Sequence, residues 1–171
     1  MKTKSQFFSE IINEIKDKQC KSFKIKKLLV DLKESAYDIN SKRYKGRTLL
    51  HYAVKYQNIK SIKLLIKMGV NPEICDDDYN TPLHLAVMLG NIDIIKELLK
   101  FNVNINATAE FDQTPLHLAI TINNYDVVKL LLDYNADLDL VDERNLKPID
   151  YAIDEKNDRM IELLSLRKGG N

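Results

Sequence analysis

Apolar residues recur along most of the chain with helical spacing, in short stretches that loops separate. One such stretch carries Leu83, Leu85, Ala86 and Leu89, and the next carries Ile92, Ile94, Ile95, Leu98 and Leu99. Charged residues such as Asp93 and Lys96 fill the opposite side of the second stretch, and Gly90-Asn91 separates the two. This pattern predicts two short antiparallel helices. From Phe101 to Gln113 the helical period is lost, which indicates a loop.

The same arrangement returns every 33 residues. Three markers of different chemistry keep this step. The first is a six-residue block at 48–53, 81–86, 114–119 and 147–152. The second is Asn58, Asn91, Asn124 and Asn157, and the third is Asn40, Glu73, Asn106 and Asp139. Because one helix pair cannot bury its apolar face alone, this period predicts helix pairs stacked in a row.

In the blocks Thr81-Pro82-Leu83-His84-Leu85-Ala86 and Thr114-Pro115-Leu116-His117-Leu118-Ala119, the chain resembles the ankyrin-repeat family. The resemblance implies an all-α fold, an ankyrin-repeat solenoid of stacked helix-turn-helix units with β-hairpin finger loops. We therefore expect a single domain over 1–171. Its expected parts are an N-cap repeat at about 5–42, repeats 43–75, 76–108 and 109–141, a C-cap repeat 142–166 and a frayed tail 167–171.

The six-residue block also contains the elements of a helix start. Thr81 has the hydroxyl of an N-cap, Pro82 falls at the first helical position, and His84 can hydrogen-bond back to the threonine. The same interpretation applies to His51 and His117. Stacked units would hold these rings about 10 Å apart, which is too far for one metal ion. We therefore assign the histidines a structural role and expect no metal site.

The loop tips have their own pattern. Gly46, Asp112 and Asn145 occupy equivalent places, and all three residue types tolerate positive φ. Tyr79 stands at the remaining equivalent place, and the sequence leaves the turn type of its loop open. The run Asp76-Asp77-Asp78 could bind a cation or a basic partner. It lacks the ligand pattern of an EF-hand loop, and we interpret it as a solvated loop tip.

Composition and charge narrow the classes of function. The 171 residues include 26 Lys and Arg against 25 Asp and Glu, with 44% hydrophobic residues, which excludes a disordered chain and a uniformly basic nucleic-acid binder. Residues 1–45 nevertheless carry a net charge of +6, and the remainder carries −5. A basic end could touch nucleic acid or an anionic membrane. We prefer a solubilising cap, because the ends of a solenoid need polar outer faces.

The two ends also carry the apolar stripes of capping units. At the start these are Phe7, Phe8, Ile11, Ile12 and Ile15, then Phe23, Leu28, Leu29 and Leu32. At the end they are Met160, Ile161, Leu163 and Leu164.

The sequence offers no catalytic or export signal. No P-loop, Rossmann glycine pattern or nucleophile elbow occurs. We expect a protein that is not an enzyme and has no cofactor and no small-molecule substrate. Cys20 and Cys75 are too few for a disulfide framework, and Glu10 and Glu14 interrupt the apolar start of the chain. A cytoplasmic, intracellular location follows, and delivery into a host cell is an analogy from the family.

The resemblance further implies a concave surface that binds another protein, whose identity stays unknown, with the chain itself a monomer. The contact positions it implies are Tyr44, Lys45, Arg47, Lys55, Tyr56, Asp77, Asp78, Asn80, Met88, Leu89, Glu110, Phe111, Gln113, Thr121, Ile122, Glu143, Arg144 and Leu146. Tyr56, Leu89 and Ile122 form an apolar column that either faces the partner or packs between first helices. The alternatives are an adaptor for nucleic acid or an anionic membrane through the Lys-rich N-terminal unit, or a regulatory subunit of an enzyme.

Overall fold

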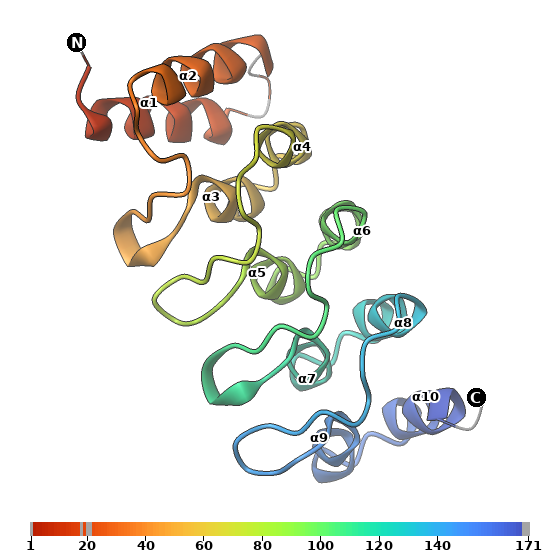
Figure 1. Ribbon diagram of the computed structural model, residues 1–171. Coiled ribbons are helices and arrows are strands. Elements are labelled where there is room, and N and C mark those ends of the chain that lie inside the picture. Colours follow the sequence, from red (N-terminus) through yellow and green to blue (C-terminus); the bar gives the residue numbers. More distant parts are fainter. Residues whose placement is uncertain (1, 18, 20–21, 169–171) are drawn as a thin grey trace. The chain divides into compact units, whose positions relative to one another are not determined.

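The computed structural model describes residues 2–17, 19 and 22–168 (Figure 1). In these ranges the chain forms ten α-helices and two 3₁₀ turns, and no strand. The helices are α1 (Lys4–Lys16), α2 (Ser22–Glu34), α3 (Leu49–Lys55), α4 (Ile59–Lys67), α5 (Pro82–Met88), α6 (Ile92–Leu99), α7 (Pro115–Thr121), α8 (Tyr125–Asp133), α9 (Pro148–Asp154) and α10 (Asp158–Lys168). The two turns are η1 (Tyr44–Gly46) and η2 (Glu110–Asp112). The predicted all-α class is confirmed.

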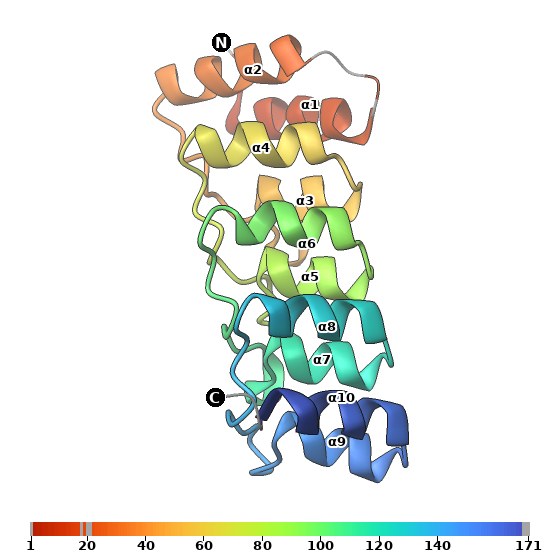
Figure 2. The ribbon, with the colours of Figure 1, turned by 90° about the vertical axis from the view of Figure 1, so that its right-hand side faces the viewer.

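The chain divides into two compact units, Met1–Leu85 and Ala86–Asn171. In the first unit α1 packs on α2 and α3, and α4 packs on α2 and α3. In the second, α7 packs on α8 and α9, and α10 packs on α8 and α9. Within each unit the second helix of one pair therefore lies against the second helix of the next pair, as Figure 2 shows for α8 and α10. Fully buried apolar side chains fill these contacts, among them Phe8, Ile11 and Leu50 in the first unit and Val127 and Leu131 in the second.

The N-terminal helix pair differs from the predicted stripes at Ile12, which is only half-buried, and more strongly at Phe23. Ile25, Leu28, Leu29 and Leu32 are buried, but Phe23 is 76% exposed. At about 100° per residue, Phe23 lies roughly 140° around the helix from Leu28. The inner side of α2 is filled by Ile25 instead, and the expected stripe that included Phe23 was wrong at that position.

The predicted β-hairpins are not confirmed. The base of each finger loop is closed by one backbone hydrogen bond. It runs from the N–H of Arg43, Asp76, Ala109 or Asp142 to the carbonyl oxygen four residues later, with N···O distances of 2.8 to 3.0 Å. The next residue is already the N-cap of a helix, at Thr48 or Thr114 for example. The backbone therefore turns into the helix before a second rung of a ladder can form.

The C-terminal helix is longer than expected. Helix α10 continues through Lys168, and Arg167 pairs with Asp133 of α8. The rest of the predicted tail, 169–171, lies outside the described residues. In the described part of the chain, no helix combines the length and apolarity needed to cross a membrane.

Candidate functional site

The three histidines hold the starts of the first helices. In each case the Thr Oγ1 and the His Nδ1 lie 2.9 Å apart, at Thr48–His51, Thr81–His84 and Thr114–His117. The backbone N–H of each threonine also donates to the same Nδ1, at 3.2 to 3.3 Å. The capping role predicted for the histidines is confirmed.

The hydrogen bonds fix the tautomer of His51 and His117. Because Nδ1 accepts from a backbone N–H, the ring proton must sit on Nε2. His51 Nε2 then donates to the carbonyl of Asn80 at 2.9 Å, and His117 Nε2 donates to that of Leu146 at 3.2 Å. Burial lowers the pKa of both histidines below 6.5. A neutral ring therefore joins α3, and likewise α7, to the base of the following finger.

Each of two fingers is built around a buried aspartate. Asp76 Oδ1 accepts from the N–H groups of Asp78 and Asn80, at 3.1 and 3.0 Å. Asp142 Oδ1 accepts in the same way from Arg144 and Leu146, both at 2.9 Å. Asp76 and Asp142 are each only 4% exposed. The interpretation of the whole run from Asp76 to Asp78 as a solvated tip was therefore wrong for Asp76, which bonds its own loop.

Asp142 also anchors a side-chain network. Tyr151 Oη donates to Asp142 Oδ2 at 2.6 Å, and Gln113 Nε2 donates to Tyr151 Oη at 2.7 Å. Burial by itself raises the pKa of Asp142. The hydrogen bonds from Tyr151, Leu146 and Arg144 outweigh this effect and lower the pKa to about 2. The carboxylate is therefore ionised at neutral pH and joins the loop from Asp142 to Leu146 to Tyr151 of α9.

The fingers use two kinds of tip. At Lys45-Gly46 and Phe111-Asp112 two successive residues have φ between 55° and 65°, whereas Tyr79 and Asn145 are single residues with φ of 58° and 62°. The question left open at Tyr79 is thus answered, since this tyrosine takes the left-handed conformation. The tips are also linked in pairs, because Asp77 N–H donates to Lys45 O at 3.2 Å and Glu143 N–H donates to Phe111 O at 3.1 Å.

The predicted contact residues divide into exposed and half-buried sets. Exposed are Tyr44, Lys45, Lys55, Asp77, Asp78, Met88, Leu89, Glu110, Phe111, Thr121, Ile122, Glu143 and Arg144. Half-buried are Arg47, Tyr56, Asn80, Gln113 and Leu146. Four members of this second set immediately precede a helix N-cap and bond to the finger scaffold, as Arg47 does to Asp76. These four residues support the fingers more than they present a surface.

The apolar column falls into two parts. Tyr56 belongs to the first unit, where it stacks on Tyr52 at 6.5 Å between ring centroids. Leu89 and Ile122 belong to the second unit and are 41% and 40% exposed. Their turns are close neighbours, since a Cβ at Gly90 would lie 2.8 Å from Asn124 Nδ2. In the second unit the column therefore faces solvent on adjacent turns.

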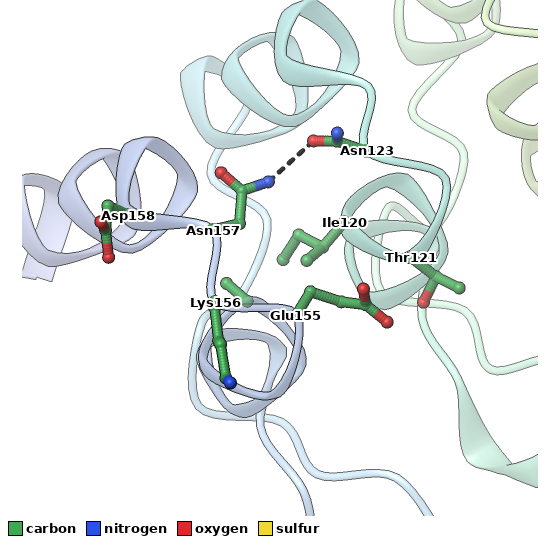
Figure 3. Close-up of a pocket in the computed structure, with 8 residues that line it drawn as sticks. Ile120, Thr121, Asn123, Glu155, Lys156, Asn157 and Asp158 are labelled. Carbon is green, nitrogen blue, oxygen red and sulfur yellow. Dashed lines mark hydrogen bonds between the residues drawn. The ribbon is translucent and has the colours of Figure 1, made fainter.

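An open pocket of about 400 Å³ continues this surface (Figure 3). Ile120 and Ala152 form its apolar floor, and both are almost fully buried. At one side Asn157 Nδ2 donates to Asn123 Oδ1 at 2.8 Å. Glu155 extends toward Thr121, whereas Lys156 points away (Figure 3). The pocket thus combines an apolar floor with polar walls.

Sequence reasoning missed Tyr79 and the pocket residues Asn123 and Glu155 as parts of a surface. Tyr79 is 64% exposed at a finger tip. Its signal was present, because a bulky aromatic residue replaces the Gly, Asp or Asn of the other tips. Asn123 and Glu155 carried no comparable signal, since both stand in polar turns.

These features define an all-α repeat protein, in which stacked helix pairs carry fingers fixed by buried polar groups. Sequence models of known families agree: the model for Ankyrin repeats (3 copies) matches residues 18–109, and that for Ankyrin repeats (many copies) matches residues 90–152. The chain belongs to the ankyrin-repeat family. Ankyrin repeats are generally protein–protein interaction modules, and the family is typically not enzymatic. A comparison with curated proteins finds no match.

Proposed function

We propose that this chain binds a partner protein through its finger tips and the C-terminal ends of its first helices. The observation that carries the proposal is the exposure of Met88, Leu89 and Ile122, each between 40% and 42%, on neighbouring turns of the second unit. Stacking does not require apolar side chains at these exposed places. Apolar side chains at the centre of an interface are the usual source of binding energy.

The finger tips of the second unit supply the remaining parts of an interface. Phe111 is 54% exposed and is held with φ of 59°. A bulky residue in this conformation costs about 1–2 kcal/mol, so its position is fixed by the surrounding loop rather than by its own preference. Glu110 lies exposed on the same finger, and Glu143 lies exposed on the next one. An apolar centre with an acidic rim suits a partner that presents apolar residues among basic ones.

The test is a comparison of matched variants of the full chain. Wild type, a Leu89→Asp/Ile122→Asp double variant and Tyr134→Asp would each be immobilised, and captured proteins would be quantified by mass spectrometry. Tyr134 is 40% exposed and provides the control, because it lies at the end of α8 instead of on the first helices. A partner of the proposed surface is retained by wild type and Tyr134→Asp and lost by the double variant.

Affinity measurements with that partner then quantify the effect. We expect the double variant to weaken binding by more than about 2 kcal/mol, the scale of interface hot spots, with a nearly unchanged melting temperature. Equal binding by all three chains would show that the partner docks elsewhere. Unfolding of the double variant would place Leu89 and Ile122 in the core instead of on the surface.

A further inference from the structure

The outer face of α2 combines apolar and basic side chains that the packing of the first unit does not use. Phe23 is 76% exposed and Val30 is 36% exposed. With 100° per residue, Phe23, Lys27 and Val30 lie on one side of the helix, and Lys26 flanks them. Lys26 and Lys27 are exposed as well. We call Phe23, Lys26, Lys27 and Val30 the α2 patch.

The α2 patch belongs to a strongly basic segment. Between positions 16 and 27 the sequence contains six lysines, no arginine and one acid, Asp17. Lys24 pairs with Glu14 of α1, and Lys16 lies over the ring of Tyr56 at 5.5 Å from its centroid. Lys18 and Lys21 lie outside the described residues. The acids of the outer side, Asp31 and Glu34, follow at the other end of α2, so the positive charge is concentrated around Phe23.

We propose that the α2 patch binds the surface of an anionic phospholipid bilayer. Clusters of four to eight basic residues on an amphipathic helix are attracted to acidic lipid headgroups, and exposed aromatic and aliphatic side chains enter the boundary between headgroups and acyl chains. Phe23 provides the apolar insertion and the lysines provide the attraction. A cap that served only solubility would not require an apolar side chain as exposed as that of Phe23, at 76%.

A lipid surface fits these residues better than a nucleic acid does. Arginine is the residue suited to bidentate recognition of single phosphates and bases, whereas lysine acts as a compact point charge. A segment with lysine only therefore matches a diffuse layer of negative charge. Val30 also favours lipid over nucleic acid, because an aliphatic side chain can enter lipid but cannot stack on a base as an aromatic ring can.

A single tryptophan makes the proposal measurable, because the chain contains none. In the Phe23→Trp variant of the full chain, the indole replaces the exposed ring of the patch. Its emission should shift to shorter wavelength on vesicles that contain phosphatidylserine, and bromine atoms on the lipid acyl chains should quench it. Leu166→Trp, at a residue 70% exposed on α10, is the matched control and should show neither effect.

The contribution of charge is tested separately by cosedimentation with the same vesicles. The Lys26→Gln/Lys27→Gln variant should bind about 20- to 30-fold more weakly, since each lysine near an anionic surface contributes roughly a fivefold factor. Wild type should not bind vesicles of pure phosphatidylcholine, and high salt should release it from the anionic ones. Circular dichroism confirms that each variant keeps its helix content.

Three results would overturn the proposal. These are equal sedimentation of wild type and the double lysine variant, unchanged emission of Phe23→Trp on anionic vesicles, and a spectral shift with a single-stranded oligonucleotide in place of lipid. The last result would assign the patch to nucleic acid. None of them bears on the protein-binding surface of the second unit, which is tested with other residues.

Discussion

Two buried aspartates illustrate how single residues determine the fingers. Asp76 and Asp142 each accept two backbone N–H groups of their own loop, at 2.9 to 3.1 Å. Buried backbone donors without partners are costly. The carboxylates therefore permit a loop of only a few residues to be ordered without a strand. This explains how the aromatic side chain of Tyr79 is held at an exposed tip.

Gly46 occupies a position at which a side chain would collide with the next finger. Its φ is 65°, and a Cβ there would lie 2.2 Å from Asp77 Oδ1 and 2.6 Å from Asp77 N. We predict that Gly46→Ala lowers the free energy of unfolding by about 2–4 kcal/mol, from the left-handed conformation and the displacement of the next finger together. Urea denaturation followed by circular dichroism measures the change.

Gly69→Ala is the control for this prediction. Gly69 also has positive φ, at 85°, but no atom lies within 4 Å of the added Cβ. In this variant the free energy of unfolding should fall by only about 1 kcal/mol, which is the cost of the left-handed backbone conformation alone. If both alanine variants lost the same amount, the close approach to Asp77 would contribute nothing.

At the scale of helices, the starts of α3, α5 and α7 were predictable from sequence, whereas the packing of α2 was predicted only in part. A threonine followed three residues later by a histidine specifies a helix start through local hydrogen bonds, so His51, His84 and His117 were assigned correctly. Even the recurrent asparagine has a local role, since Asn58, Asn91 and Asn124 cap the second helices. Whether Phe23 faces inward depends on the helices around α2, which no local pattern contains.

The internal hydrogen bonding of the finger loops and the pocket could not be predicted from the sequence. The sequence marked the turns through Gly46, Asp112 and Asn145, but it did not reveal that Asp76 is buried. Asp76 and Asp77 are adjacent and chemically identical, and only the folded loop turns one inward and the other outward. The pocket at Ile120 likewise depends on how two turns 33 residues apart meet.

The buried caps predict how stability depends on pH. Burial holds the pKa of His51 and His117 below 6.5, so the unfolded chain binds their protons at higher pH than the folded chain does. The contribution of these two neutral rings to the free energy of unfolding is complete above about pH 6.5 and is lost as the pH falls below that value. The pKa of Asp142 is lowered from 3.8 to about 2, and its contribution is lost between about pH 4 and 2.

Urea unfolding at a series of pH values would measure this profile. As the pH falls below about 6.5, the free energy of unfolding should decrease less in the His117→Gln variant than in wild type. Below about pH 4 it should decrease less in Asp142→Asn. Each variant thus serves as the control for the other. Stability that increased on acidification from pH 7 to 5 would contradict the neutral, Nε2-protonated state of the buried rings.

At the scale of the whole molecule, the terminal helix pairs cover apolar surface that the inner pairs cannot cover themselves. Phe8, Ile11 and Ile15 of α1 are fully buried in the first unit, and Met160 and Leu164 of α10 are buried in the second. We predict that a chain limited to residues 43–146 aggregates, because it exposes the partners of these side chains. Light scattering and analytical ultracentrifugation would detect the aggregates.

Chains lacking only one terminal pair separate the two contributions. Residues 43–171 and 1–146 should each be less stable than the full chain, and each should associate in a concentration-dependent way. A monomeric 43–146 chain with undiminished stability would show that the outer helix pairs do not act as caps.

The spacing of hydrogen bonds between neighbouring helix pairs has a consequence for synthesis of the chain. In the described part of the protein, such bonds join residues 29 apart, as at His51 and Asn80, and up to 43 apart, as at Asn58 and Ile15. Within each unit a helix pair therefore meets its earlier partner soon after it leaves the ribosome. Short separations of this kind favour fast folding. The nascent chain can become ordered progressively from its N-terminus while the rest is still being translated.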